Sequence, residues 1–312
     1  MAKPVAPAAA EQVERVSGRE LSTRLFLERY AADSRQPVIL LDLVSTWPAY
    51  QEWCRPDGEP DLAKLAADFR GVTGPVVDCG RNYDVETWDV GDYFDWASRA
   101  SGPREGESLY LKDWHLVQAC RSQGVKVPYE APGYLAAPLQ DWLNLHMDSA
   151  GRKDDYRFSY VGVAGTRTPL HHDVLFSHSW SANICGRKHW IFYPPEVSSN
   201  VLDSLGNAAE SAHPQRRVDG WQGQFPGLQQ AWDMRLEAFQ EEGEIMFVPS
   251  GWYHEASRSD ANLQSKCVDL PSFMLALVLP APTVLERLFF AVLALGMNAK
   301  QPPVAATSCT DR

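Results

Sequence analysis

The sequence predicts a mostly β protein with flanking helices, in which short antiparallel strands form a sandwich or barrel. The main observation is a series of short runs after about residue 105 that are aromatic and β-branched and are separated by Gly and Pro. Before that point, helical and strand-like segments are mixed along the chain. Such a series of strands is typical of a jelly roll or barrel rather than of repeated βαβ units.

The composition is that of a soluble globular protein, because 45% of the 312 residues are hydrophobic and 22% are charged. The formal net charge of -11 argues against binding to nucleic acid or to an anionic membrane surface. The six cysteines include no C-x-x-C pair, which excludes the usual zinc-knuckle and redox spacings. With no secretory signal at the N-terminus, we expect a reducing compartment and a cytoplasmic or nuclear protein.

In the first third of the chain, helix signals surround one strand. Ser17 with Glu20 three residues later is a capping-box pattern that predicts the start of a helix. The apolar run 37–43 has the length of a strand, and residues 61–69 and 87–100 place apolar side chains at helical spacing.

These signals divide the chain into four parts. Residues 1–16 are expected to form a disordered leader, and residues 17–105 a mixed helix and strand segment packed on the barrel. Residues 106–264 form the expected barrel core, with strands predicted at 107–114, 155–165, 179–184, 188–195 and 244–250. Residues 265–312 are a divergent apolar tail.

A long insertion rich in Gly, Gln and Pro interrupts the barrel strands between residues 195 and 241. It is too long for a simple hairpin. In a compact domain, a segment of this kind is usually functional or disordered.

The segment TPLHHDVLFSHSW, residues 168–180, is either a metal site or a histidine-rich loop. Alternate residues of a strand project from the same face, so His171 and Asp173 should point together while His172 points away. His254, much later in the chain, offers a third ligand. Two histidines and one carboxylate leave the other positions of an iron open for substrate and oxygen, as in non-haem Fe(II) oxygenases. Alone, this pattern is weak, because exposed or core histidines produce it by chance.

Further side chains strengthen the metal interpretation. Lys188 lies on a strand that an antiparallel return would place beside the first, where its ammonium could hold the far carboxylate of a bidentate cosubstrate. Thr168 and Tyr110 could offer hydroxyl groups to the same carboxylate, which needs such partners when buried. Taken singly, Lys188 would be interpreted as a solvated turn lysine and Tyr110 as a core aromatic residue.

The runs YRFSYVGVAGTRTPLHHDVLFSHSWSANICGRKHWIFYPP and FVPSGWYHEA resemble the JmjC family of Fe(II)- and 2-oxoglutarate-dependent oxygenases. The resemblance covers roughly residues 20–258 and rests on several motifs in the same order. It implies a double-stranded β-helix, a jelly-roll barrel with helices packed on its outside. It also implies that His171, Asp173 and His254 bind iron, and that His172 and His178 lie outside the metal site.

The same resemblance implies a cosubstrate pocket. Lys188, Thr168 and Tyr110 would bind the distal carboxylate of 2-oxoglutarate, and Ser181 stands where many relatives have Asn. LYLKDWHL, DDYRF and SWSANICGRK further resemble one branch of the family, whose activity is lysyl hydroxylation of the class 1 eukaryotic release factor. Fe(II), 2-oxoglutarate and O2 would then be the reaction components, and a protein lysine the substrate.

The end of the chain departs from the family pattern, because we find no counterpart of the final barrel strand after about Leu263. Two apolar runs, FMLALVLP and LFFAVLALGM, follow instead. A membrane-spanning helix is disfavoured, because each run is shorter than the roughly 20 residues that a span needs. Two alternatives remain: a helix over residues 283–297 that pairs two subunits in a homodimer, and an altered chain end that leaves the barrel open and a sheet edge exposed.

These observations favour an active protein hydroxylase, since the three ligands and Lys188 are all present. The main alternative is a non-catalytic binding protein whose cosubstrate pocket is impaired by the altered C-terminus. A cupin-like enzyme that uses Zn or Mn, and a histone demethylase, are further alternatives. No nucleic-acid partner is expected.

Overall fold

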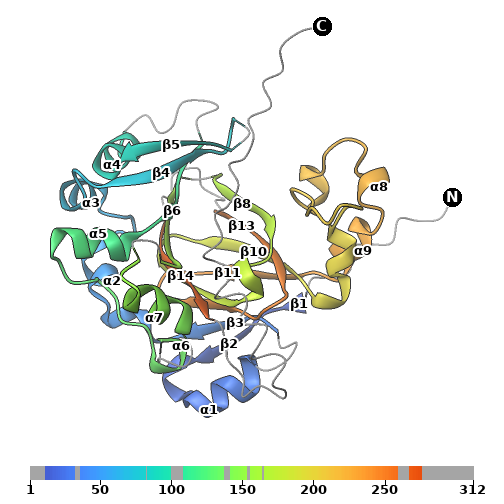
Figure 1. Ribbon diagram of the computed structural model, residues 1–312, viewed down its shortest axis with the longest axis horizontal. Helices are drawn as coiled ribbons and strands as arrows, with labels where there is room; N and C mark the ends of the chain where they lie inside the picture. The colour runs from blue at the N-terminus through green and yellow to red at the C-terminus, as the bar shows by residue number, and fades with distance from the viewer. Residues whose placement is uncertain are drawn as a thin grey trace, which may run out of the picture. The chain divides into compact units, whose positions relative to one another are not determined.

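A computed structural model describes residues 11–31, 36–81, 83–99, 108–136, 141–152, 155–163, 165–258 and 267–275 (Figure 1). These residues confirm the predicted mostly β fold, a jelly-roll barrel with flanking helices. The strands are β1 (Glu11–Gln12), β2 (Glu14–Ser17), β3 (Val38–Leu41), β4 (Thr73–Asp78), β5 (Asp84–Asp89), β6 (Leu109–Trp114), β7 (Arg157–Gly162), β8 (Arg167–His171), β9 (His178–Cys185), β10 (Lys188–Tyr193), β11 (Leu236–Gln240), β12 (Ile245–Val248), β13 (Tyr253–Arg258) and β14 (Cys267–Leu275).

Helices connect and flank these strands. The α-helices are α1 (Thr23–Phe26), α2 (Pro48–Trp53), α3 (Leu62–Asp68), α4 (Val90–Ala97), α5 (Leu116–Gln123), α6 (Gly133–Ala136), α7 (Trp142–Ser149), α8 (Trp221–Gln224) and α9 (Leu228–Asp233). Shorter turns are the 3-10 helices η1 (Gly18–Glu20), η3 (Val44–Thr46), η4 (Val174–Phe176), η5 (Pro195–Val201) and η6 (Pro214–Arg216), and the π-helical turn η2 (Leu27–Ala31).

The described strands form two sheets. One has the strand order β1-β11-β10-β13-β8, and the other has the order β2-β3-β12-β9-β14-β7-β6-β4-β5. All pairings except β1 with β11 and β2 with β3 are antiparallel in these sheets. Figure 1 shows α2 to α5 on one side of the strands and α8 and α9 on the other.

The principal core joins the N-terminal helices to the barrel. Phe26 of α1 meets Phe247 of β12 edge to face, with ring centroids 4.9 Å apart. Trp47 packs against Trp180 of β9, which is fully buried. Burial of these large rings is the main contribution that holds the N-terminal segment on the sheet.

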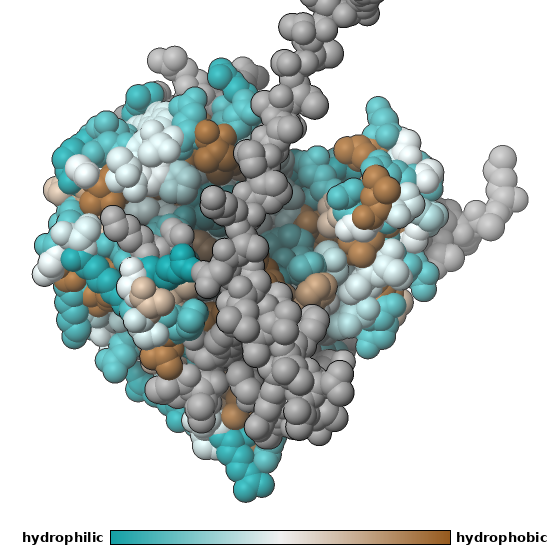
Figure 2. Space-filling view, viewed as in Figure 1, coloured by the Kyte–Doolittle hydropathy of each residue, from teal (hydrophilic) through white to brown (hydrophobic). Residues whose placement is uncertain are grey.

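The insertion forms a lobe of its own, which we call the insertion lobe (residues 195–235). Its apolar residues, among them Val201, Leu228 and Trp232, form a separate cluster that also contains Ile191 and Tyr253 of the barrel. Figure 2 shows hydrophilic and apolar side chains interspersed on the visible face, and a hollow beside this lobe. The sequence predicted the interruption but not its helices.

Several predicted elements are found where the sequence placed them. The run 37–43 contains β3, and residues 61–69 contain α3, whose N-cap Asp61 accepts a hydrogen bond from the Lys64 backbone N–H at 3.0 Å. The segment 87–100 is a helix only from Val90, because its first residues belong to β5.

The start of the chain corrects two predictions. Ser17 does not cap a long helix, because it ends β2, which pairs parallel with β3. The α-helix begins instead after Ser22, whose side chain accepts a hydrogen bond from the Leu25 N–H. The predicted disordered leader was also wrong for its last residues, since β1 begins at Glu11 and β2 at Glu14. Residues 1–10 lie outside the described part of the chain.

The end of the barrel corrects a third prediction. We expected no further strand after Leu263, but β14 lies between β9 and β7 and pairs antiparallel with both. The predicted open edge is therefore filled at this position of the sheet. The predicted helix over 283–297, and with it the proposed dimer contact, lies outside the described residues. None of the described helices is long and apolar enough to cross a membrane.

Cys54 and Cys185 form a disulfide across 131 residues of sequence, which the scattered cysteines did not indicate. The bond joins the residue after α2 to the end of β9. The cytoplasmic or nuclear location stays a prediction.

The Phe26–Phe247 contact yields a test of the core. Phe247→Ala should lower the free energy of unfolding by about 3–5 kcal/mol, because it removes a fully buried ring and leaves a cavity. Urea unfolding followed by tryptophan fluorescence measures this. Phe239→Ala, at a side chain that is 37% exposed, is the control and should cost about 1 kcal/mol or less. Equal losses in the two variants would contradict this description of the core.

Candidate functional site

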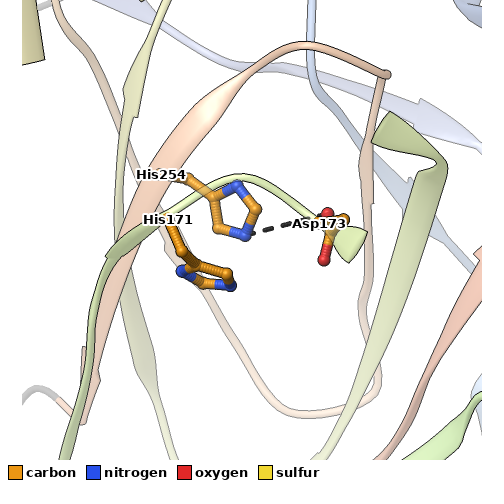
Figure 3. Close-up of side chains that lie close together, drawn as sticks. All are labelled: His171, Asp173 and His254. Carbon is orange, nitrogen blue, oxygen red and sulfur yellow. Dashed lines mark ion pairs between the residues drawn. The ribbon is translucent and has the colours of Figure 1, made fainter. Parts of the chain in front are cut away.

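The two sheet strands β8 and β13 bring the predicted metal ligands together. His171, the last residue of β8, is the register partner of His254 on β13. Asp173 follows with φ -65° and ψ 150°, so the backbone stays extended beyond the strand and the carboxylate projects on the same side as His171. Figure 3 shows the three side chains converging from these two segments.

A bulge in β8 sets this register. His254 faces His171, whereas Ala256 faces Thr168, so the register shifts between the two pairs. Pro169 lies in the shifted stretch and has no backbone N–H to donate. The N–H of Leu170 donates to the Glu210 carbonyl of the insertion lobe at 3.0 Å. The lobe therefore takes part in the geometry of the strand that carries His171.

The distances suit a single metal ion. The ligand atoms of His171, Asp173 and His254 all lie within 4.8 Å of one another. His254 Nε2 is 3.9 Å from Asp173 Oδ2, and the two imidazole centroids are 4.3 Å apart. Ligands about 2.0–2.2 Å from a common ion must approach one another this closely.

The backbone fixes which ring nitrogen faces the metal position. His171 Nδ1 lies 2.8 Å from the Pro169 carbonyl, and His254 Nδ1 lies 3.1 Å from the Trp252 carbonyl. Because a carbonyl only accepts, both Nδ1 atoms carry the hydrogen, and each Nε2 keeps its lone pair. Hydrogen bonds of this kind orient metal-binding imidazoles in proteins.

Burial keeps both imidazoles neutral. It lowers the pKa of His254 to about 4, with a further decrease from His171 that Asp173 opposes. Burial also lowers the pKa of His171, again against the effect of Asp173. A metal must compete with protons for these nitrogens, so neutral rings at pH 7 favour metal binding.

Asp173 is held by a residue that the sequence did not single out. Ser179 of β9 donates its hydroxyl hydrogen to Asp173 Oδ2 at 2.6 Å. The hydrogen bond fixes one carboxylate oxygen in place. Its only sequence signal was its position in the predicted strand 179–184, facing the same interior.

A narrow cavity extends from the three ligands into the barrel. Its wall is formed by Asp173 and by residues of β6, β7, β8, β9, β10 and β13: Tyr110, Tyr160, Thr168, His171, Ser179, Lys188, Trp190, His254 and Ala256. All predicted site residues except Ser181 therefore line one cavity. Tyr160 and Trp190 were not assigned to it from the sequence.

Lys188 is buried in this cavity wall, with 5% of its surface exposed. Its Nζ donates to Ser181 Oγ at 3.4 Å, which links the fourth predicted cosubstrate residue to the cavity. The ammonium also lies 4.1 Å from the centroid of the Trp190 ring. An ammonium at this position of the wall can form a charge-assisted hydrogen bond to a carboxylate in the cavity. The expectation of a solvated turn lysine does not hold.

The predicted hydroxyl donors lie in the same wall. Tyr110 of β6 is buried, and Thr168 of β8 is partly buried beside Ala256. The two imidazoles and the carboxylate fit Fe(II). The buried ammonium and the hydroxyl groups in the same cavity fit a dicarboxylate. Their roles as cosubstrate contacts stay predictions.

The two remaining histidines of the segment 168–180 do not join the ligands. His172 stacks on Phe176 with centroids 4.1 Å apart, and its Nδ1 lies 2.7 Å from the Asp173 carbonyl. His178 stacks on Phe247, and its Nδ1 accepts the Ser250 N–H at 3.1 Å.

The chain is similar in sequence to proteins with a cupin-like domain, whose family model matches residues 23–268. It is 37% identical to the arginine-specific demethylase JMJ20 of Arabidopsis thaliana, over 78% of this chain and 54% of that protein. It is 34% identical to the 2-oxoglutarate and iron-dependent oxygenase JMJD4 of Danio rerio, over 76% of this chain and 56% of that protein. It is 35% identical to JMJD4 of Homo sapiens, over 69% of this chain and 51% of that protein. The chain spans about half the length of these relatives.

The environment of His178 predicts a pH effect on stability in metal-free protein. Burial lowers the pKa of His178 to about 4, while the unfolded chain keeps a value near 6.5, so only the unfolded chain gains a proton between these values. Stability should be full above pH 6.5 and fall toward pH 4. From pH 7 to pH 5 the unfolding temperature should fall by roughly 4 °C or more. In thermal scans with a chelator, the unfolding temperature of His178→Asn should fall less than that of the wild type between pH 7 and pH 5. An equal fall in the two proteins would contradict this role of His178.

Proposed function

The chain belongs to the family of proteins with the cupin-like JmjC domain, and we propose that it is an Fe(II)- and 2-oxoglutarate-dependent oxygenase that hydroxylates a protein side chain. The observation that carries this proposal is a single cavity lined by His171, Asp173, His254 and the buried Lys188. A structural metal site has no need of a buried ammonium within the same cavity.

Each residue has a part in holding the reactants. His171, Asp173 and His254 would bind Fe(II) on one face and leave the opposite positions open. Lys188 would hold the distal carboxylate of 2-oxoglutarate, with hydroxyl groups from Thr168 and Tyr110. Bound Fe(II) with 2-oxoglutarate supplies the activation of O2 that inserts oxygen into an unactivated C–H bond, with succinate and CO2 as coproducts.

The chain's own residues position the reactants and exclude water. Ser179 keeps Asp173 in place, and the backbone carbonyls keep both imidazoles in the ligating tautomer. Trp190 covers the Lys188 ammonium on one side, which shields the carboxylate contact from solvent. Rigid placement of this kind is the main contribution that a protein makes to a reaction carried by its cofactor.

We infer that the substrate is a lysine side chain of a translation termination factor. Support comes from the resemblance to the lysyl hydroxylase branch of the family and from sequence identity of 34–35% to proteins named 2-oxoglutarate and iron-dependent oxygenase.

A second candidate is demethylation of methylarginine, favoured by 37% identity to a protein named arginine-specific demethylase. The filled position of β14 weakens the alternative of a binding protein with an open barrel. We keep a cytoplasmic or nuclear location and a homodimer as further proposals.

Turnover assays separate these functions. The purified chain with Fe(II), 2-oxoglutarate and O2 is incubated with a eukaryotic release factor or with methylarginine peptides, and succinate and product masses are measured. Gain of one oxygen atom on a lysine supports hydroxylation, whereas loss of a methyl group with formaldehyde supports demethylation. Iron-loaded, folded protein that forms no succinate with any substrate would contradict an active oxygenase.

Asp173→Ala should abolish iron-dependent turnover and leave the fold intact. It removes the anionic ligand, and loss of groups that merely orient ligands already costs roughly 10–100-fold. We therefore expect a decrease in succinate formation of at least roughly 100-fold. Asp57→Ala, at an exposed carboxylate paired with Arg55, is the control and should keep wild-type turnover. Near-normal activity of Asp173→Ala would contradict the ligand assignment.

Lys188→Ala should raise the 2-oxoglutarate concentration at half-maximal rate. A lost charge-assisted hydrogen bond of about 1.5–3 kcal/mol corresponds to a roughly 10–150-fold increase. Iron affinity, measured by metal titration, should change much less, because Lys188 is no ligand. The control Lys64→Ala, at a lysine of α3 that pairs with Asp68, should leave both constants unchanged. Loss of iron binding with an unchanged 2-oxoglutarate requirement would show that Lys188 is structural.

A further inference from the structure

An ion pair lies beside the metal cavity on β6. Lys112 Nζ is 2.6 Å from Asp113 Oδ2, and we call these two residues the rim pair. Both side chains are partly accessible, with exposures of 23% and 45%. Neither residue is needed for the metal or for the cosubstrate contacts described above.

The backbone turns Asp113 out of the regular strand. Asp113 has φ 58°, the left-handed conformation that residues with a side chain rarely adopt. The register of β6 with β7 shifts between Leu111 and Trp114, so Asp113 lies in a bulge. Bulges commonly re-aim a side chain, and strained residues cluster at functional sites.

Tyr160 connects the rim pair to the cavity. Its hydroxyl donates to Asp113 Oδ1 at 2.9 Å, while the residue lines the cavity with the metal ligands. The Tyr160 ring centroid is 5.9 Å from Lys112 Nζ and also 5.9 Å from Lys188 Nζ. Tyr160 therefore lies between the rim pair and the residue proposed to hold the cosubstrate.

A single side chain, Tyr160, separates the rim pair from the cavity of the metal ligands. Tyr160, which donates to Asp113, and the metal ligand His171 line the same cavity. A group bound at Asp113 would thus lie close to the position where the reaction is proposed to occur.

We propose that Asp113 is a specificity-determining residue that binds the cationic side chain of the protein substrate, the ammonium of a lysine or the guanidinium of an arginine. The proposal rests on the oxygenase function proposed above and names the chemical class of its substrate. In the substrate-free protein, the Lys112 ammonium takes the place of the substrate cation.

Lys112 shows that the position accepts a cation. Its ammonium meets a carboxylate whose other oxygen is fixed by Tyr160, and it lies within cation–π distance of the same tyrosine ring. Carboxylate and ring face together select a positive charge over a neutral side chain. The pair is partly exposed, and such ion pairs contribute little, so a substrate cation can displace Lys112.

Peptide libraries test this without knowledge of the natural substrate. Four libraries share randomised flanking positions and differ at the central residue, which is lysine, norleucine, arginine or citrulline. Dissociation constants are measured anaerobically for the full chain loaded with Fe(II) and 2-oxoglutarate. Succinate formation in air is measured in parallel. The two cation/neutral pairs distinguish a lysine substrate from an arginine substrate.

For the wild type we expect roughly tenfold tighter binding of a cationic library than of its neutral counterpart. Asp113→Asn keeps the shape and an acceptor for Tyr160 but should remove most of that preference. Lys112→Met removes the competing ammonium without touching Asp113, and should tighten binding of the cationic library roughly threefold. Asp68→Asn is the matched control, since Asp68 is 40% exposed and pairs with Lys64 at 2.9 Å. It should leave the preference unchanged.

The outcomes separate this inference from the proposed function. Equal binding of cationic and neutral libraries by the wild type, or an unchanged preference in Asp113→Asn, overturns the role of Asp113 even if succinate forms. If the protein prefers cationic libraries through Asp113 but forms no succinate, the result supports the cation site and contradicts the proposed oxygenase function. If Asp113→Asn does not fold, weaker binding of the cationic library by Lys112→Met overturns the inference.

Discussion

The candidate site depends on the antiparallel pairing of β8 with β13. This pairing places His171 opposite His254, and the extended backbone after β8 adds Asp173 to the same side. A slip of one residue would turn every side chain of one strand to the other face and separate the two imidazoles. The register is fixed by a bulge in β8, where Leu170 donates its N–H to the insertion lobe. A second contact anchors the lobe to β13. The buried carboxylate of Glu255, the residue after His254, accepts hydrogen bonds from Tyr193 of β10 and from Ser211 of the lobe.

The barrel interior around this register is unusually polar for a core. Lys188, Ser181 and Asn183 are buried on β10 and β9, and the Lys188 ammonium lies close to the rings of Trp190 and Tyr160. Burying such groups is costly unless they have partners, and a core that served stability alone would be apolar. Asn183 has such partners, since its amide donates to the carbonyls of Gly186 and Gln240, and Lys188 donates to Ser181. The apolar packing that stabilises the fold lies elsewhere, between the N-terminal helices and β9 and β12.

Local patterns and the family resemblance together predicted the metal ligands and the cosubstrate residues, and the structure brings all of them except Ser181 together around one cavity, with Ser181 bonded to Lys188. The alternation of side chains along a strand indicated that His171 and Asp173 point together, and an antiparallel return indicated the place of Lys188, but the roles of these residues were implied by the family resemblance. Features that depend on distant partners were missed. Ser17 looked like a helix cap but is held in a parallel pair with β3. The disulfide of Cys54 and Cys185, the strand β14 and the bulge at Asp113 likewise arise from contacts between segments far apart in the sequence.

The central claim is that three ligands and a buried ammonium assemble a working site for Fe(II) and 2-oxoglutarate. An anaerobic titration of the full chain with Fe(II), and then with 2-oxoglutarate, tests it most directly, because the metal chelate of 2-oxoglutarate has a visible charge-transfer band. We expect the band to appear and to saturate at one equivalent of iron per chain. A folded, iron-loaded protein that shows no band at saturating 2-oxoglutarate would contradict the account and leave a metal-binding protein without a cosubstrate pocket.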